Sequence, residues 1–164
     1  MASIFDAAEE GDIGAITGFL NDNDLDIDDK NAEGYTALMV AIMAGQAAAG
    51  SLLVERDADV HIADNKGNTA LHLSCIRNTR LGTSMILWAG ATCDKINHRG
   101  NTAMHEAAIC GAKDCMWLIL ESGGEQCKEI KNNDGKTPLD LARESTHENA
   151  AKVVHMLEVG EHLD

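Results

Sequence analysis

The chain has 164 residues and a formal net charge of −14, and 45% of its residues are hydrophobic but only 3% are aromatic. This length fits one domain or one short repeat array, and the scarcity of aromatic side chains favours small-residue packing between helices over a β-sandwich. The acidic balance argues against nucleic-acid binding and against anionic lipid, which need a basic surface. The longest apolar stretches, residues 37–45 and 85–91, are far shorter than the roughly 20 residues of a membrane span, so no membrane association is expected.

The first segment, residues 1–30, carries a short helical pattern in two parts. Ile4, Phe5 and the alanines that follow precede Gly11, and a second apolar pair at residues 19–20 precedes Asn23. Neither the basic region nor the apolar region of a secretory signal is present in residues 1–11. We therefore expect a cytoplasmic and/or nuclear protein whose five cysteines are reduced thiols.

The four following segments repeat one pattern. Each begins with Asp or Asn, has Gly three residues later and Thr two residues after that, and continues into an apolar helical stretch. Thr36, Thr69 and Thr102 are spaced by 33 residues, and Thr137 follows 35 residues later. The two additional residues fall after Gly123, where a longer loop can absorb them. A repeat at this period predicts a stack of similar structural units.

Each unit is expected to contain a hairpin finger followed by two antiparallel helices. The Gly of the repeated turn permits a positive φ, and the Thr can cap the first helix with its hydroxyl. Alanines such as Ala41 and Ala107 allow neighbouring helices to pack closely. Gly50 and Gly82, inside the second helices, predict that the middle units are softer than the fourth.

These segments resemble the ankyrin family, whose pattern runs D-x-x-G-x-T-P-L-H-x-A-A. The residues that carry the resemblance are Thr69–His72 and Thr102–His105, which match this signature with Ala in place of Pro. The resemblance implies an all-α repeat solenoid, a single domain of helix-turn-helix pairs joined by β-hairpin fingers. Its five units are approximately residues 1–30, 31–63, 64–96, 97–131 and 132–164, and the two terminal ones act as caps. It also implies that His72 and His105 brace the fingers by hydrogen bonds.

The resemblance further implies a binding surface for a partner protein on the concave face, formed by the fingertips and the exposed sides of the first helices. The residues expected to contact the partner are Tyr35, Met43, Lys66, Asn68, Ile76, Arg77, His98, Arg99, Asn101, Ile109 and Lys136. Across all the concave positions, six cations (Lys30, Lys66, Arg77, Arg99, Lys131, Lys136) outnumber three anions (Glu33, Asp134, Glu144). This local balance on an acidic molecule predicts a partner with an acidic and apolar segment. We expect a monomeric, non-enzymatic adaptor, scaffold or inhibitor.

The outer helices suggest an alternative. Trp88 and Trp117 are expected to face outward on the second helices of neighbouring units. They either cover weak packing beside Gly82 or bind a further protein. In the latter case the chain would be a targeting or regulatory subunit of a larger enzyme or proteolytic assembly, and it would use the convex face as well.

No catalytic, cofactor or metal site is expected. Gly135-Lys136-Thr137 imitates the end of a phosphate loop, but Ile130 occupies the place of the required earlier Gly. Potential metal ligands are close in sequence without the spacing of a known motif: His98, His105, Cys110, Cys115 and Cys127. The acidic stretch that includes Asp22, Asp24 and Asp29 lacks the Gly and Glu of a calcium loop.

Overall fold

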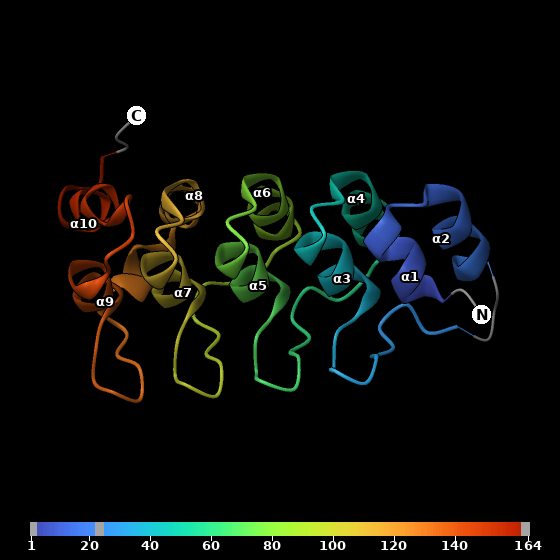
Figure 1. The fold of residues 1–164 in the computed structure, drawn as a ribbon, viewed down its shortest axis with the longest axis horizontal. Coiled ribbons are helices and arrows are strands. Elements are labelled where there is room, and N and C mark those ends of the chain that lie inside the picture. Colours follow the sequence, from blue (N-terminus) through green and yellow to red (C-terminus); the bar gives the residue numbers. More distant parts are fainter. Residues whose placement is uncertain (1–2, 22–24, 162–164) are drawn as a thin grey trace.

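A computed structural model describes residues 3–21 and 25–161 of the chain. Its helices follow one another in pairs along a single line of stacked units (Figure 1). The first helices of the pairs are α1 (Ile4–Glu10), α3 (Ala37–Met43), α5 (Ala70–Ile76), α7 (Ala103–Ile109) and α9 (Pro138–Glu144). The second helices are α2 (Ile13–Leu20), α4 (Ala47–Glu55), α6 (Arg80–Trp88), α8 (Lys113–Glu121) and α10 (Ala150–Val159). A 3₁₀ helix, η1 (Gly124–Glu129), follows α8. The expected all-α repeat solenoid is confirmed.

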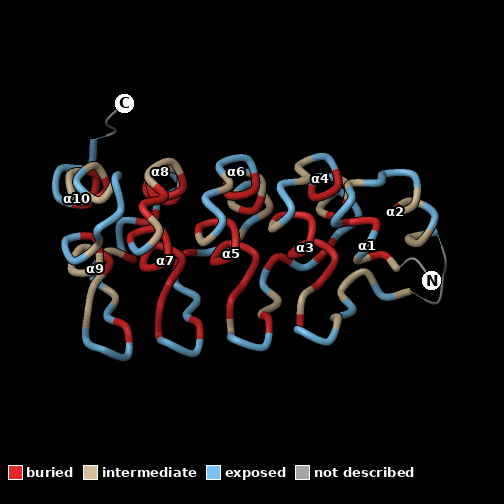
Figure 2. Tube along the Cα trace, in the orientation of Figure 1, coloured by how far each residue is buried: buried red, intermediate tan, exposed pale blue. Residues whose placement is uncertain are grey.

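Three layers run along the stack. The first helices of each pair form the middle layer, with the second helices on one side and the fingers on the other (Figure 1). The middle layer is the most deeply buried part, whereas the fingertips and the outer sides of the second helices are exposed (Figure 2). The solenoid therefore offers two long surfaces, one along the fingers and one along the outer helices.

The repeated Thr begins each first helix, as the sequence predicts. The hydroxyl oxygens of Thr36 and Thr137 accept hydrogen bonds from the backbone N–H groups of Met39 and Asp140. Thr69 and Thr102 occupy the same N-cap position. The Gly of each finger turn adopts the expected positive φ, 81° at Gly67 for example, a region that L side chains seldom enter.

The fingers are tight and contain almost no regular β-structure. Among the described residues the only β pairing is an isolated bridge between Ala63 and Thr69. Each finger closes through an Asp or Asn side chain at its base: the Asn31 Oδ1 atom accepts from the backbone N–H groups of Glu33 and Tyr35 at 3.1 and 2.9 Å. The backbone pairs across the same base, since the Asn31 N–H donates to the Tyr35 carbonyl at 3.0 Å and the other three fingers repeat this bond. The fingers are therefore very short hairpins, closed by one backbone bond and an Asx turn.

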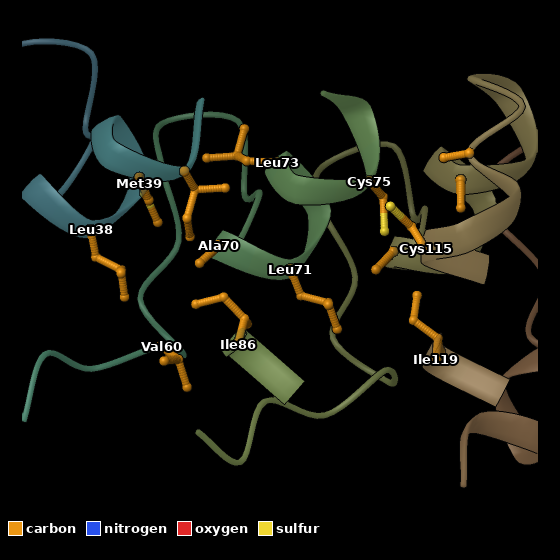
Figure 3. Close-up of a cluster of buried hydrophobic side chains, with 14 of the residues drawn as sticks. Leu38, Met39, Val60, Ala70, Leu71, Leu73, Cys75, Ile86, Cys115 and Ile119 are labelled. Carbon is orange, nitrogen blue, oxygen red and sulfur yellow. The ribbon is translucent and has the colours of Figure 1, made fainter. Parts of the chain in front are cut away.

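The core is continuous from one unit to the next. Leu38, Leu71 and Ile119 come from three successive units and are no more than 1% exposed. Figure 3 shows such side chains pointing into the space between the two helix layers. Since each layer of side chains contacts the next, a unit in the middle of the stack depends on both neighbours.

One disulfide departs from the expectation that every cysteine is reduced. Cys93, in the loop after α6, is bonded to Cys127 in η1, while Cys75, Cys110 and Cys115 are free. The 3₁₀ helix formed by the additional residues after Gly123 brings Cys127 against the loop of the preceding unit. The expectation of reduced thiols is therefore wrong for this pair, and the argument from reduced cysteines to a cytoplasmic or nuclear location loses its basis.

Among the helices of residues 3–21 and 25–161, none combines the length and the apolar character needed to cross a bilayer.

Candidate protein-binding surface

The predicted contact residues line a series of hollows between neighbouring fingers and first helices, a surface called the finger groove below. The first hollow includes Tyr35, Met43 and Arg77, and the last includes Ile109. The central and largest of the three, about 470 Å³, is lined by Asn65, Lys66, Asn68, Ile76, Asn97, His98 and Arg99. The structure thus brings most of the predicted residues onto one surface, and it adds acidic and polar neighbours such as Glu9 and Ser145.

The central hollow has one apolar lining residue, Ile76, among polar and cationic ones. Ile76 is partly buried at the end of α5, while the side chains of Lys66 and Arg99 rise from successive fingers. His98 is exposed between them. An apolar centre with a charged rim is the usual composition of a protein–protein interface.

Not every cation in the finger groove is available to a partner. The Arg99 guanidinium lies 2.6 Å from the buried carboxylate of Glu106, and the Lys136 ammonium lies 2.6 Å from Glu144. Within the described residues, Lys66 and Arg77 form no such ion pair, and both side chains are exposed. Among the cations that line the three hollows, those without an ion pair within the described residues are therefore Lys66 and Arg77, at the boundary between the second, third and fourth units.

Asn68 and Asn101 are placed differently from the sequence expectation. They are only 6% and 2% exposed, so their side chains lie below the groove surface rather than on it. The Asn68 Oδ1 atom accepts from the Asn97 amide at 2.9 Å, and the Asn101 Oδ1 atom accepts from the Asn132 amide at 2.8 Å. These residues connect the bases of successive fingers and thereby fix their spacing.

Glu106 is the centre of this buried network and was not predicted. Its Oε1 atom accepts hydrogen bonds from Asn97 Nδ2 at 2.8 Å, Asn101 Nδ2 at 3.0 Å and the Arg99 guanidinium. The residue is 2% exposed, so these three donors replace the water that a carboxylate needs. A sequence signal did exist, because Glu106 interrupts the apolar inner face formed by Met104, Ala107 and their neighbours.

The two predicted structural histidines connect each unit to the next. In both, Nδ1 accepts from the backbone N–H of the helix-capping Thr, at 3.2 Å for Thr69 and 3.0 Å for Thr102. The Nε2–H of His72 therefore donates to the carbonyl of Asn101 at 2.9 Å, and that of His105 donates to the carbonyl of Lys136 at 3.0 Å. Each ring is held neutral by these bonds, in one tautomer, between a helix cap and the following finger.

We predict that acidification weakens the solenoid through these histidines. Burial lowers the pKa of His72 and of His105 below the ordinary value of 6.5, because the charged ring would be desolvated. The unfolded chain then binds protons that the folded chain does not. The neutral histidines therefore contribute fully to the free energy of unfolding above pH 6.5, and this contribution falls as the pH drops toward their folded-state pKa values. The loss is at most about 1.4 kcal/mol per pH unit for each histidine.

Urea unfolding at pH 7.5, 6.5 and 5.5 measures this loss. The double variant His72→Gln/His105→Gln should be less stable at pH 7.5 but should show a smaller decline between pH 7.5 and 5.5. An equal decline in the variant would assign the acid sensitivity to other groups.

Two free cysteines are buried next to each other, and the described side chains do not gather into a metal site. Cys75 and Cys115 lie side by side in the core (Figure 3). The hydrogen bond to Cys115 and burial raise the pKa of the Cys75 thiol, which keeps it protonated and unreactive. No group of three His, Cys, Asp or Glu side chains in residues 3–21 and 25–161 is placed to hold a metal ion. Asp22 and Asp24, considered above for a calcium loop, lie outside the described residues.

The two tryptophans differ from each other. Trp88, the last residue of α6, is 85% exposed and therefore cannot cover the packing beside Gly82. Trp117 is partly buried and packs against the core. The sequence pattern placed both outward, and only the packing of the neighbouring units distinguishes an exposed side chain from a covered one.

Comparison with known proteins agrees with the architecture. A family model for ankyrin repeats in three copies matches residues 4–83 and again residues 80–161. A comparison with curated protein sequences finds no significant match. Ankyrin repeats are generally modules for protein–protein interaction. The repeated turn, the capping threonine, the bracing histidines and the matched family model together place this chain in the ankyrin-repeat family.

Proposed function

We propose that the chain is a binding module, an adaptor or an inhibitor, that holds an acidic and apolar segment of one partner protein in the finger groove. The observation that carries the proposal is the central hollow, whose lining combines Ile76 with cations of two successive fingers. The first hollow extends this surface with Tyr35, Met43 and Arg77. Apolar anchors would supply affinity, and the cations would orient the partner and increase its association rate.

The electrostatics of the whole molecule support this choice of partner. With a net charge of −14, the chain repels most acidic proteins at a distance. Lys66 and Arg77 concentrate unpaired positive charge on the finger groove, so an acidic segment is favoured there and disfavoured elsewhere. The interaction should weaken as salt increases.

We predict that the double variant Lys66→Glu/Arg77→Glu loses at least 10-fold in affinity for the groove partner while it keeps its melting temperature. Both side chains are exposed and make no ion pair within the described residues, so the reversal changes the field of the groove without removing a structural contact. Affinity capture from the source cells, followed by quantitative mass spectrometry, identifies the proteins that the wild type retains and the variant loses. Titration of the captured protein then gives the change in affinity.

The matched control is Arg56→Glu/Lys95→Glu, which makes the same change of charge on two exposed residues outside the three groove hollows. The control should retain the same partner. Loss of the partner from both variants would indicate dependence on total charge, and retention by both would reject the finger groove as the binding surface. Arg99 is unsuitable for this test, because reversing it would place a second carboxylate beside buried Glu106.

A further inference from the structure

The outer side of α6 carries an exposed apolar stripe. Leu81 and Trp88 are 70% and 85% exposed and are seven residues apart, which places them on one side of the helix. The equivalent positions of the neighbouring helices, 33 residues away, are occupied by Ala48 and Asp114 and by Glu55 and Glu121. The stripe is therefore particular to the third unit and is not a feature that the repeat requires.

A pocket opens beside the N-terminal end of this stripe. Its volume is about 190 Å³, and it lies between α6 and the turn that connects α3 to α4. The lining is almost entirely apolar: Ala41, Ile42, Gly45, Gln46, Ala47, Thr79, Leu81, Gly82 and Met85. A Cβ atom at Gly82 would lie 2.8 Å from Thr79 Oγ1 and 3.3 Å from Ile42 Cγ2. Because Gly82 has no side chain, the space between these two lining residues stays open. An aliphatic side chain fits such a hollow.

The C-terminal end of the stripe lies in a negative field. Exposed charges in residues 55–61, 88–95 and 121–126 comprise six carboxylates (Glu55, Asp57, Asp59, Asp94, Glu121, Glu125) and two cations (Arg56, Lys95). Glu125 is paired with Lys128 at 2.6 Å, so five of these carboxylates have no ion pair within the described residues. The helices α4, α6 and α8 end at this edge, and none has a basic residue in its last turn. Their C-terminal carbonyl groups add to the negative potential. The electrostatic potential at this edge is therefore negative, whereas the unpaired cations in the finger groove make the potential there positive.

We propose that this outer surface is a second docking site, which takes a basic amphipathic helix from another protein. An aliphatic side chain of that helix enters the pocket beside Leu81, and an Arg or Lys stacks on the face of Trp88 among the carboxylates. Cations bind the face of Trp more strongly than that of any other aromatic ring. Seven residues of α6 span about 10 Å, so the two anchors of the ligand are two helical turns apart.

The two surfaces select different partners. The finger groove favours an acidic segment, and the outer surface favours a basic one, so one chain can hold both proteins at once. This inference does not depend on the proposed function of the finger groove, because none of the residues that carry it lines the three hollows of that groove. Helix α6 itself lies in the outer layer, on the side away from the fingers (Figure 1).

The test uses the full chain and two labelled synthetic peptides of 18 residues. One is an amphipathic helix of Leu, Lys and Arg, and the other replaces each Lys and Arg by Glu. We expect the basic peptide to bind and to change the tryptophan fluorescence, and the acidic peptide not to bind to this surface. The variants Trp88→Ala and Glu55→Lys/Glu121→Lys should each lower the affinity for the basic peptide at least 10-fold. Because these side chains are exposed, the melting temperature should not change.

Filling the pocket provides an independent check. Ala47→Leu places an aliphatic side chain into the pocket and should lower the affinity for the basic peptide. The matched control is Ala151→Leu, on the exposed side of α10, which should leave this affinity unchanged. Lys66→Glu/Arg77→Glu should leave basic-peptide binding intact, which separates this site from the finger groove. Unchanged affinity of the basic peptide in Trp88→Ala, or binding of the acidic peptide to the wild type that Trp88→Ala weakens, would overturn the proposal. A dimer of the wild type that Trp88→Ala dissociates in sedimentation would replace the partner by a second copy of the chain.

Discussion

Reduction of the Cys93–Cys127 disulfide is expected to lower the free energy of unfolding by about 4 kcal/mol, the value that the chain-entropy relation gives for a loop of this size. The bond closes a loop across a sequence separation of 34, about one repeat, and joins the third unit to η1. Both cysteines are buried, so the bond also holds the last two units in contact with the rest of the stack. A solenoid depends on contacts between neighbours, and loss of one such link should loosen the C-terminal units first.

Urea unfolding of the wild type with and without dithiothreitol measures this contribution. The double variant Cys93→Ala/Cys127→Ala should unfold near the reduced wild type and should not respond to the reductant. Thiol titration in denaturant should find three free thiols in the oxidised wild type, matching Cys75, Cys110 and Cys115. Five free thiols in protein isolated without reductant would contradict the bond.

Replacement of Glu106 by Ala is expected to cost about 3 kcal/mol of stability. The buried Asn101 amide would lose its acceptor, and the Asn97 amide would lose one of two and keep Asn68 Oδ1. An unsatisfied buried donor costs about 1–3 kcal/mol, and a lost hydrogen bond to a charged group adds about 1.5–3 kcal/mol at most. Arg99 contributes less to this loss, because its side chain is 65% exposed and regains water. The variant should also loosen the fingers, since these amides connect the bases of three successive units.

Chemical denaturation and hydrogen exchange of the finger backbone test this prediction. The matched control is Glu144→Ala, which removes an exposed carboxylate paired with Lys136 and should leave the free energy of unfolding nearly unchanged. A double-mutant cycle with Arg99→Ala separates the ion pair from the amide network. Equal effects of Glu106→Ala and Glu144→Ala would show that the buried network contributes no more than a surface pair.

The predicted contact cations divide into Lys66 and Arg77, which have no ion pair within the described residues, and Arg99 and Lys136, which are paired with Glu106 and Glu144. A charge reversal at Arg99 would change folding and binding together. The proposed groove is therefore best tested from its unpaired cations, with stability measured on each variant.

The repeated pattern was sufficient to predict the architecture. The spacing of Thr36, Thr69 and Thr102 determined the units, and the Gly and Thr of each turn predicted the positive φ and the helix cap that the structure contains. Such features are local, because they follow from backbone conformation and from hydrogen bonds between residues three apart. The positions of His72 and His105 came with the resemblance, and the structure confirms the hydrogen bonds by which they brace the fingers.

Only the tertiary structure decided which side chains are available. Asn68 and Asn101 have the sequence position of fingertip neighbours, yet burial and the Glu106 network remove them from the surface. Cys93 and Cys127 are nearly one repeat apart, a separation that could have suggested pairing, but it was η1 that brought them within bonding distance. Charge pairing, burial and bonding depend on contacts between units that are distant in sequence, whereas the fold of each unit depends on neighbours along the chain. For this reason the sequence by itself determined the solenoid, and its tertiary structure decided which of its residues a partner can reach.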